Sequence, residues 1–290
     1  MSIPLDFRCI QCHLRRNLET ARKLGTEEQA TAFAKELMKL YLSAPEGVSS
    51  PWLAPATADL FQRFYGVPED RFREEKEISN RFVLERLDDI RARVEQAEDP
   101  LLAGLRFAIL GNYIDFSALQ GQVSFAELDR LLDRAEEMTP AGDGYVHLRA
   151  DLQKAKSLLY LTDNAGEIGF DRIFAEVIHE QYPQLEITFC VRGGPAMNDA
   201  LRADAELMEV PFPVIDNGNR VAGTQLDQLS ADAKQALENA DVIIAKGQGN
   251  AETLLDSGYN IYFAFLVKCI RFEERFNKPK LTPMLVRERD

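Results

Sequence analysis

The stretch SLLYLTDNAGEIGFDRIFAEVI, residues 157–178, contains the pattern that decides the fold. It begins with an apolar run from Leu158 to Leu161, of the length and kind expected for a buried parallel strand. It ends with apolar residues at the spacing of an amphipathic helix, namely Ile168, Phe170, Ile173, Phe174, Val177 and Ile178. The polar turn between them is therefore predicted at the carboxyl end of a sheet, where open α/β sheets bind ligands.

This turn places Asp163 and Asn164 side by side and adds Glu167 at the start of the helix. Carboxylate and amide oxygens suit a hard cation such as Mg²⁺ or Mn²⁺, and the free N–H groups of a helix start suit a phosphate. The same residues also serve ordinary capping, since Asp and Asn are common N-caps and Glu is favoured in the first turn. The turn alone leaves both interpretations open.

The composition indicates a large acidic protein. Its 290 residues, 46% of them hydrophobic, are enough for two domains and a sizeable core. The net charge of -13 disfavours a nucleic-acid partner, because an acidic surface repels polyanions. There is no membrane-spanning apolar run and no signal-peptide core, so we expect a cytoplasmic protein without a membrane partner. Four cysteines are too few for a disulfide scaffold and are expected to be reduced.

The pattern of the chain changes near residue 150. Residues 1–150 are predicted to be helical, and the charged segment 74–98 reads as one long helix with a single apolar stripe. From there, strands are predicted at 157–162, 186–191, 212–215, 241–245 and 261–267, alternating with helices at 167–181, 198–208, 230–239 and 251–256. This alternation predicts an α/β fold with a mostly parallel sheet flanked by helices. It leaves strand order and oligomeric state open.

Polar, glycine-bearing loops follow four successive predicted strands, and their shared edge favours a functional interpretation. Asp163, Asn164 and Asp199 can give three oxygens to one divalent cation and leave positions for water and a phosphate. Lys246 is expected to be a mobile point charge for that phosphate. The sequence contains no P-loop and no Gly-rich dinucleotide fingerprint.

A further polar segment, Gly111 to Phe116, follows an apolar predicted helix. On local chemistry alone it is best explained as a helix C-cap and an Asn turn. We also expect Asn112 and Asp115 to face a substrate pocket between the domains, with the helical domain as its lid.

Together these motifs resemble the damage-control phosphatase family, long catalogued as domain of unknown function eighty-nine. The resemblance covers nearly the whole chain and rests on Cys9-x-x-Cys12, Gly111-Asn112-x-x-Asp115-Phe116, Asp163-Asn164-Ala165-Gly166-Glu167 with Phe170-Asp171, Arg192-Gly193 with Asn198-Asp199, Lys246-Gly247-Gln248-Gly249-Asn250 with Glu252, and Lys268-Cys269. The cysteine motifs resemble the branch found in archaea and some bacteria. The resemblance implies an N-terminal helical domain, residues 1–150, on a Rossmann-like α/β domain, residues 151–290.

The same resemblance implies a divalent-metal-dependent phosphatase acting on small phosphorylated metabolites, such as sugar phosphates or damaged cofactor precursors. It assigns the metal, which is Mn, Mg, Co or Ni, to Asp163, Asn164 and Asp199. We assign catalysis to Asp163, Asn164 and Lys246. Contact with the substrate is assigned to polar residues of the neighbouring segments: Asn112, Asp115, Glu167, Arg192, Asn198, Lys246 and Asn250.

Two other functions are weighed beside the phosphatase. Some relatives have been described as carboxyl methyltransferases using S-adenosylmethionine, but this chain lacks a Gly-rich first loop for that cofactor. A non-catalytic metabolite-binding protein would use the cation as a structural clamp.

The cysteines allow a second metal hypothesis. Cys9, Cys12 and Cys269 could bind a soft metal if His13 completed the set, because C-x-x-C is a zinc-type spacing. Small buried side chains of a reduced protein explain them at least as well, and Cys190 is expected in the core.

Overall fold

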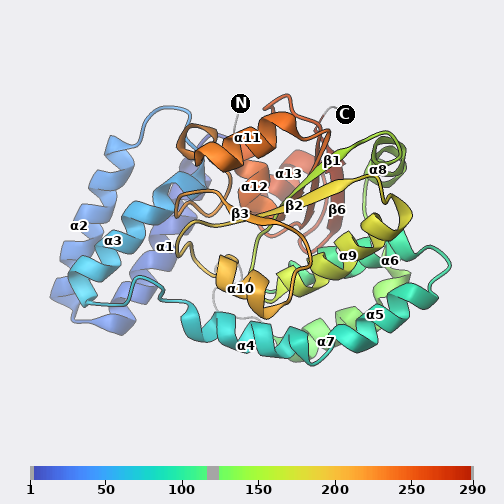
Figure 1. Cartoon of the computed structure of the whole chain (residues 1–290). Helices are drawn as coiled ribbons and strands as arrows, with labels where there is room; N and C mark the ends of the chain where they lie inside the picture. The colour runs from blue at the N-terminus through green and yellow to red at the C-terminus, as the bar shows by residue number, and fades with distance from the viewer. Residues whose placement is uncertain (1–2, 116–123, 289–290) are drawn as a thin grey trace.

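The computed structural model describes residues 3–115 and 124–288, so Phe116 of the predicted polar segment lies outside the described residues. The described residues form a six-stranded sheet in the order β3-β2-β1-β4-β5-β6 (Figure 1). Neighbouring strands are parallel except for β5 and β6. The strands are β1 Ser157–Leu161, β2 Glu186–Val191, β3 Val214–Asp216, β4 Val242–Lys246, β5 Ile261–Leu266 and β6 Pro283–Arg287.

Helices cover both faces of this sheet (Figure 1). The helices that precede the sheet are α1 Phe7–Leu24, α2 Glu27–Ser43, α3 Ala54–Tyr65, α4 Arg73–Leu84, α5 Leu87–Gln96, α6 Pro100–Gly111, α7 Phe125–Asp133 and α8 Gly144–Leu152. Those that alternate with the strands are α9 Glu167–Gln181, α10 Arg202–Leu207, α11 Ala231–Asn239, α12 Gly247–Leu254 and α13 Ile270–Phe276. No helix in the described part of the chain is long and apolar enough to span a membrane.

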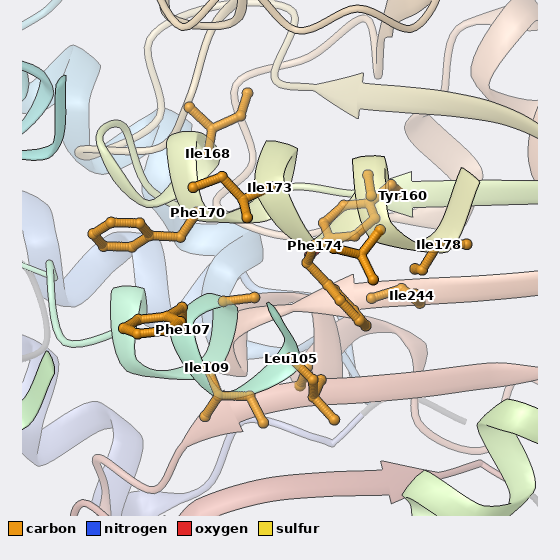
Figure 2. Packing of buried hydrophobic residues seen from close by; sticks show 14 of the residues in the cluster. Leu105, Phe107, Ile109, Tyr160, Ile168, Phe170, Ile173, Phe174, Ile178 and Ile244 are labelled. Atoms are coloured by element: carbon orange, nitrogen blue, oxygen red, sulfur yellow. The ribbon is translucent and has the colours of Figure 1, made fainter. Parts of the chain in front are cut away.

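The core follows from the alternation of side chains along the strands. Leu158 and Tyr160 of β1 pack in the cluster that contains α6 and α9, whereas Leu159 and Leu161 pack on the opposite face. Figure 2 shows the first cluster, in which side chains of α6 face those of α9. Gly104 of α6 allows close packing, since a Cβ there would lie 3.2 Å from the Phe174 ring. The predicted α/β fold is confirmed, and Cys190 lies in the core as expected.

The helices that precede the sheet contribute to two separate hydrophobic clusters, and the domain boundary near residue 150 stays a prediction. A separate cluster joins α1, α2 and α3 through Ala21, Phe33, Leu37 and Phe61. By contrast, buried apolar residues of α4 to α8, such as Val83 and Leu148, belong to the cluster on the α9 face of the sheet. The helices from α4 onward therefore share the sheet's core, while the role of the helical segment as a lid stays a prediction.

Three predicted elements need correction. The segment 74–98 is two helices, α4 and α5, which are separated at Glu85 and Arg86. The helix predicted at 198–208 begins only at Arg202, because the backbone before it pairs with the loop after β1. The residues after Lys246 form the start of α12 and not a loop, although Gly247 and Gly249 are poor helix formers.

Candidate active site

The strand order reverses between β1 and β4, and ligands of open α/β sheets bind outside the carboxyl ends of the strands at such a point. Asp163 follows β1 and Gly247 follows β4. Gly247 has φ +76°, and a Cβ added there would lie 1.9 Å from Oδ2 of Asp163. The two loops therefore touch, and only glycine leaves room for the carboxylate.

The loop after β2 pairs with the loop after β1 and brings a second carboxylate to the same place. The N–H of Ala200 donates to the carbonyl oxygen of Asp163 at 2.7 Å, and Asn164 and Asp199 form an antiparallel bridge. Backbone hydrogen bonds thus bring Asp199, which is distant in the sequence, to the adjacent residues Asp163 and Asn164. Their side chains are buried, with 7%, 2% and 4% of each residue exposed.

Asn112 lies at the C-cap of α6 and connects that helix to the turn after β1. Its amide nitrogen donates to Oδ2 of Asp163 at 2.9 Å and to Oε1 of Glu167 at 3.1 Å. Its side-chain oxygen accepts a hydrogen bond from the N–H of Leu266 at 3.1 Å. Asn112 therefore lies beside the Asp163 carboxylate and fixes one of its oxygens, while the expected substrate pocket stays a prediction.

Lys246 is fully buried and is not the mobile point charge expected from the sequence. Its Nζ donates to Oε1 of Glu167 at 2.7 Å, to Oδ1 of Asp171 at 2.6 Å and to the carbonyl oxygen of Ala108 at 2.8 Å. Burial acts to lower the pKa of Lys246, but the two carboxylates outweigh it, so the pKa lies above its usual value. The ammonium group is therefore charged and uses its donors within the protein.

Two other predicted substrate contacts also hold the protein together. Glu167 is fully buried and accepts hydrogen bonds from Asn164 at 2.6 Å and from Lys246. Asn250 donates to the backbone carbonyl oxygens of Thr162 and Lys246, at 3.0 and 2.7 Å. These side chains fix the turns after β1 and β4, so their geometry gives them a positioning role and not the predicted contact with substrate.

Arg192 contacts both acidic residues of the site. Its Nε donates to Oδ2 of Asp199 at 2.6 Å, and its Nη2 lies 3.9 Å from Oδ1 of Asp163. Nη2 is buried and has no hydrogen-bond partner among the described residues. Asn198, the residue before Asp199, donates a hydrogen bond to Oδ1 of Asn164 at 2.8 Å.

Lys268 is a cation of the site that sequence reasoning did not assign. Its Nζ donates to Oδ2 of Asp115 at 2.8 Å, and its charge acts to lower the pKa of Asp163. It lies just after β5, the one parallel strand whose carboxyl end was not included among the functional loops. Its position at the carboxyl edge of the parallel strands is the sequence signal that could have identified Lys268.

The acidic residues fit a divalent cation. Within the described residues, Oδ1 of Asp163 and Oδ1 of Asp199 accept no hydrogen bond, while Oδ2 of each has a partner. Burial raises the pKa of Asp163 well above its usual range, and the charge of Asp199 adds to this effect. Burial likewise raises the pKa of Asp199 to about 6, although Arg192 opposes the shift. The folded chain therefore holds carboxylates that a cation would stabilise.

The charges of the buried cluster lead to the same conclusion. Five carboxylates face three cationic side chains among the described residues, so two formal negative charges remain. The carboxylates are Asp115, Asp163, Glu167, Asp171 and Asp199, and the cations are Arg192, Lys246 and Lys268. One divalent cation would balance them.

The cysteines near the N-terminus do not form the predicted soft-metal site. Cys9 Sγ accepts a hydrogen bond from Arg271 at 3.2 Å, and His13 bonds to the Tyr41 hydroxyl at 2.6 Å. Cys12 is exposed. Across residues 3–115 and 124–288, no three or more His, Cys, Asp or Glu side chains are arranged to hold a metal. The site proposed at Asp163 includes only two such side chains, because its third donor is an amide.

Comparison with protein-family models identifies the chain. Residues 6–280 match the family described as the damage-control phosphatase ARMT1-like domain. The chain belongs to this family. A damage-control phosphatase of Archaeoglobus fulgidus is 30% identical over 268 residues, which cover 90% of this chain and 91% of that protein. A damage-control phosphatase of Pyrococcus horikoshii is 36% identical over 182 residues, which cover 61% of each chain.

A solved structure supports the same assignment. The crystal structure of a DUF89 family protein from Pyrococcus horikoshii aligns with 98% of this chain and 99% of its own, with a TM-score of 0.83 and 27% identity. This likeness extends over the helical segment as well as the sheet. The resemblance read from the sequence motifs to the damage-control phosphatase family is therefore confirmed.

Proposed function

We propose that this member of the damage-control phosphatase family is a divalent-metal-dependent hydrolase of phosphate monoesters on small metabolites. One observation carries the proposal. Among the described residues, Asp163 and Asp199 each present an oxygen without a hydrogen bond at the point where the strand order reverses. The relatives in Archaeoglobus fulgidus and Pyrococcus horikoshii are named damage-control phosphatases, which supports the same reaction class.

In this proposal Asp163, Asn164 and Asp199 hold the cation, which is Mn, Mg, Co or Ni. When bound, it supplies positive charge to the phosphoryl oxygens and activates water for attack. Asn112 holds Oδ2 of Asp163, while Oδ1, which lies 3.9 Å from Nη2 of Arg192, accepts no hydrogen bond within the described residues. Arg192 holds Oδ2 of Asp199 in the same way. The protein thus orients both carboxylates before any ligand arrives.

The phosphate group has two cationic partners in this scheme. Arg192 offers Nη2, a buried donor that lacks a protein acceptor among the described residues. Lys268 offers an ammonium group that, in the contacts given above, donates one hydrogen bond, to Asp115. Because charge develops on the phosphoryl oxygens during transfer, fixed cations there stabilise the transition state. Lys246 and Glu167 have an indirect role in this scheme, because they fix the turn that carries Asp163 and Asn164.

Metal restoration tests the proposal. Protein dialysed against a chelator should hydrolyse p-nitrophenyl phosphate or glucose 6-phosphate only after Mg²⁺, Mn²⁺, Co²⁺ or Ni²⁺ is added back. Hydrolysis by a metal-loaded sample would also exclude a purely metabolite-binding role. Hydrolysis without metal, or none across a broad panel of phosphate esters, would overturn the proposed function. Calorimetric binding of S-adenosylmethionine would favour the methyltransferase alternative instead.

A further inference from the structure

A second hydrogen-bonded group lies behind the candidate site, in the core between β1, β4 and α9. Asp171 of α9 accepts two hydrogen bonds on Oδ1, from Nζ of Lys246 at 2.6 Å and from the hydroxyl of Tyr160 at 2.8 Å. All three side chains are fully buried. Oδ2 of Asp171 is buried as well and has no hydrogen-bond partner among the described residues. This carboxylate therefore depends on two donors for its stabilisation in the core.

The ring of Tyr160 holds its hydroxyl in a fixed place. It stacks on Phe189 of β2, with centroids 4.7 Å apart and an interplanar angle of 5°. It also meets Phe174 of α9 edge to face, with centroids 6.4 Å apart (Figure 2). Burial and the charge of Asp171 raise the pKa of Tyr160 well above its usual value, so the hydroxyl keeps its proton. Tyr160 thus presents a rigid hydrogen-bond donor to Asp171.

Four hydrogen bonds connect Tyr160 to one of the proposed metal ligands. The first two join Tyr160 and Lys246 to Asp171. Lys246 also donates to Oε1 of Glu167 at 2.7 Å. Oε2 of Glu167 accepts a hydrogen bond from Nδ2 of Asn164 at 2.6 Å, which fixes the amide of that proposed ligand. The path therefore runs from a core strand to the turn that carries the site.

Stability alone does not account for this charged group. Buried ion pairs are often no more stabilising than apolar residues of the same volume, because both partners lose their water. What a hydrogen-bonded pair adds is direction, since donors and acceptors meet at short distances and near-linear angles. Asp171 and the carbonyl oxygen of Ala108 hold two donors of Lys246. The third donor is thereby aimed at Glu167, beside the metal site.

We propose that Tyr160 and Asp171 are positioning residues of the metal site. They act through Lys246 and Glu167, which hold the amide of Asn164 in place. This inference rests on the proposed function and deepens it, because it names residues that set the affinity of the same site for its cation. Residues that orient metal ligands from outside the coordination shell change metal affinity without touching the metal.

The charge of Asp171 depends on pH in the neutral range. Burial raises the pKa of Asp171 to about 7, although the charge of Lys246 opposes the shift. In the described part of the chain, the groups that face this carboxylate are Tyr160 of β1, Lys246 of β4 and Glu167 of its own helix, and α6 adds the carbonyl oxygen of Ala108. Below its pKa, Asp171 is neutral and holds Lys246 less firmly, and the cluster loses one negative charge. Metal affinity should therefore fall as the pH falls through this range.

Tyr160→Phe tests the inference, because it removes one oxygen atom and leaves the stacked ring in place. Tyr262→Phe is the matched control, since Tyr262 is also fully buried and its hydroxyl donates to the carboxylate of Asp151 at 2.7 Å. Calorimetric titration of Mn²⁺ into chelator-treated protein measures the affinity. We expect Tyr160→Phe to weaken Mn²⁺ binding by about three- to tenfold, less than the roughly 10–100-fold typical of residues that contact a metal ligand. Tyr262→Phe should change it by less than about twofold, with a similar drop in melting temperature.

Two further readouts separate positioning from a structural role. The hydrogen bond from Tyr160 lowers the pKa of Asp171, so in Tyr160→Phe the pH at which Mn²⁺ affinity is half its maximum should rise by about one unit. KM for p-nitrophenyl phosphate at saturating Mn²⁺ should stay within about twofold of wild type. Asp171→Asn keeps the shape but not the charge and should weaken Mn²⁺ binding at least as much. Adding Tyr160→Phe to it should have little further effect, because the two residues act along one path.

Unchanged Mn²⁺ affinity and pH dependence in Tyr160→Phe would overturn the inference and leave the proposed function intact. Equal losses of affinity in Tyr160→Phe and Tyr262→Phe would show a structural role and also overturn it. If Asp171→Asn does not fold, Tyr160→Phe decides by itself. If wild-type protein binds Mn²⁺ but hydrolyses no phosphate ester, the proposed function fails while the measured affinities still decide the positioning role. Wild-type protein that binds no divalent cation would overturn both.

Discussion

The loops after β1 and β4 touch at the reversal of strand order, yet they use their charged residues in opposite ways. Asp163 after β1 is 7% exposed and keeps Oδ1 without a hydrogen bond within the described residues. Lys246 after β4 is fully buried and directs its ammonium group at Glu167, Asp171 and the Ala108 carbonyl oxygen. Both are charged residues at the carboxyl edge of the sheet, but of the two only Asp163 keeps a side-chain oxygen without a hydrogen bond among the described residues.

This difference teaches that position at a strand end does not assign a role. The decisive property is the number of donors or acceptors that remain after the protein's own hydrogen bonds are formed. By this measure, we propose that residues of the β1 loop take part in the chemistry and that Lys246 of β4 supports them. The predictions below test that division, beginning with the largest expected effect.

Asp163→Ala should lower kcat/KM by more than about 100-fold at saturating metal, since even residues behind a metal ligand change activity by 10–100-fold. The apo protein should be equally stable, or more stable by up to about 1 kcal/mol, because a buried carboxylate that repels its neighbours is removed. Asn112 and Asn164 lose one acceptor but keep Glu167 as another. Metal affinity, melting temperature and kcat/KM check these expectations.

Asp204 provides the matched control, because it is also 7% exposed. Unlike Asp163, it uses both oxygens, accepting from Asn80 at 2.7 Å and from the N–H of Leu201 at 2.8 Å. Asp204→Ala should therefore destabilise the fold by about 1–3 kcal/mol and leave turnover at saturating metal largely intact. Near-normal turnover by Asp163→Ala would mean that the central assignment of the site is wrong.

Lys246→Met tests the supporting side of the comparison. Removing the ammonium leaves Glu167 and Asp171 buried without their cation, which should destabilise the protein by about 3–5 kcal/mol. Lys234→Met on exposed α11 is the control and should change stability by less than about 0.5 kcal/mol. Urea unfolding measures both. A Lys246→Met protein of normal stability with only a raised KM would restore the direct phosphate contact expected from the sequence.

Gly247→Ala tests the contact between the two loops. Both Gly247 and Gly258 have positive φ, +76° and +85°, so alanine is strained at either position by about 1 kcal/mol. Within the described residues, the Cβ added at Gly247 would lie 1.9 Å from Oδ2 of Asp163, whereas a Cβ added at Gly258 would have no atom within 4 Å. Gly247→Ala should lose stability and metal affinity, and Gly258→Ala stability alone. Equal metal affinity in the two variants would show that the loops can separate without consequence.

Much of this comparison was readable from the sequence, because local patterns specify it. The strand before Asp163 and the helix after it were predicted within a residue of their observed bounds, since an apolar run and a helical period follow each other directly. The predicted grouping of Asp163, Asn164 and Asp199 also agrees with the structure. What that prediction needed was only that parallel strands end at one edge.

The support of the β4 loop could not be predicted in the same way. Nothing local distinguishes a lysine that faces solvent from one directed at Asp171, which lies on α9 and whose partner depends on strand order. Gly249 likewise favours a loop by propensity, but close packing against the Ala222 carbonyl oxygen, 2.2 Å from a hypothetical Cβ, accompanies a helix there. The partners of Lys246 and the packing around Gly249 depend on the tertiary fold, so they become known only when the positions of segments distant in the sequence are known.

The smallest expected effect concerns Lys268, the cation that the strand-end pattern could have revealed. Its ammonium lies beside Asp115 and acts on Asp163 as a positive charge. Lys268→Gln should raise KM for a phosphate ester by about tenfold, the scale of one charge-assisted hydrogen bond. Metal affinity should rise or stay constant, because a positive charge near the cation is removed.

Lys280→Gln, on the exposed segment after α13, is the control and should change neither KM nor metal affinity. Titration of the metal and steady-state kinetics at saturating metal separate the two effects. If Lys268→Gln weakens metal binding and leaves KM unchanged, Lys268 does not contact the phosphate. It would then support the acidic residues, as Lys246 does, and the proposed role of the cation after β5 would be wrong.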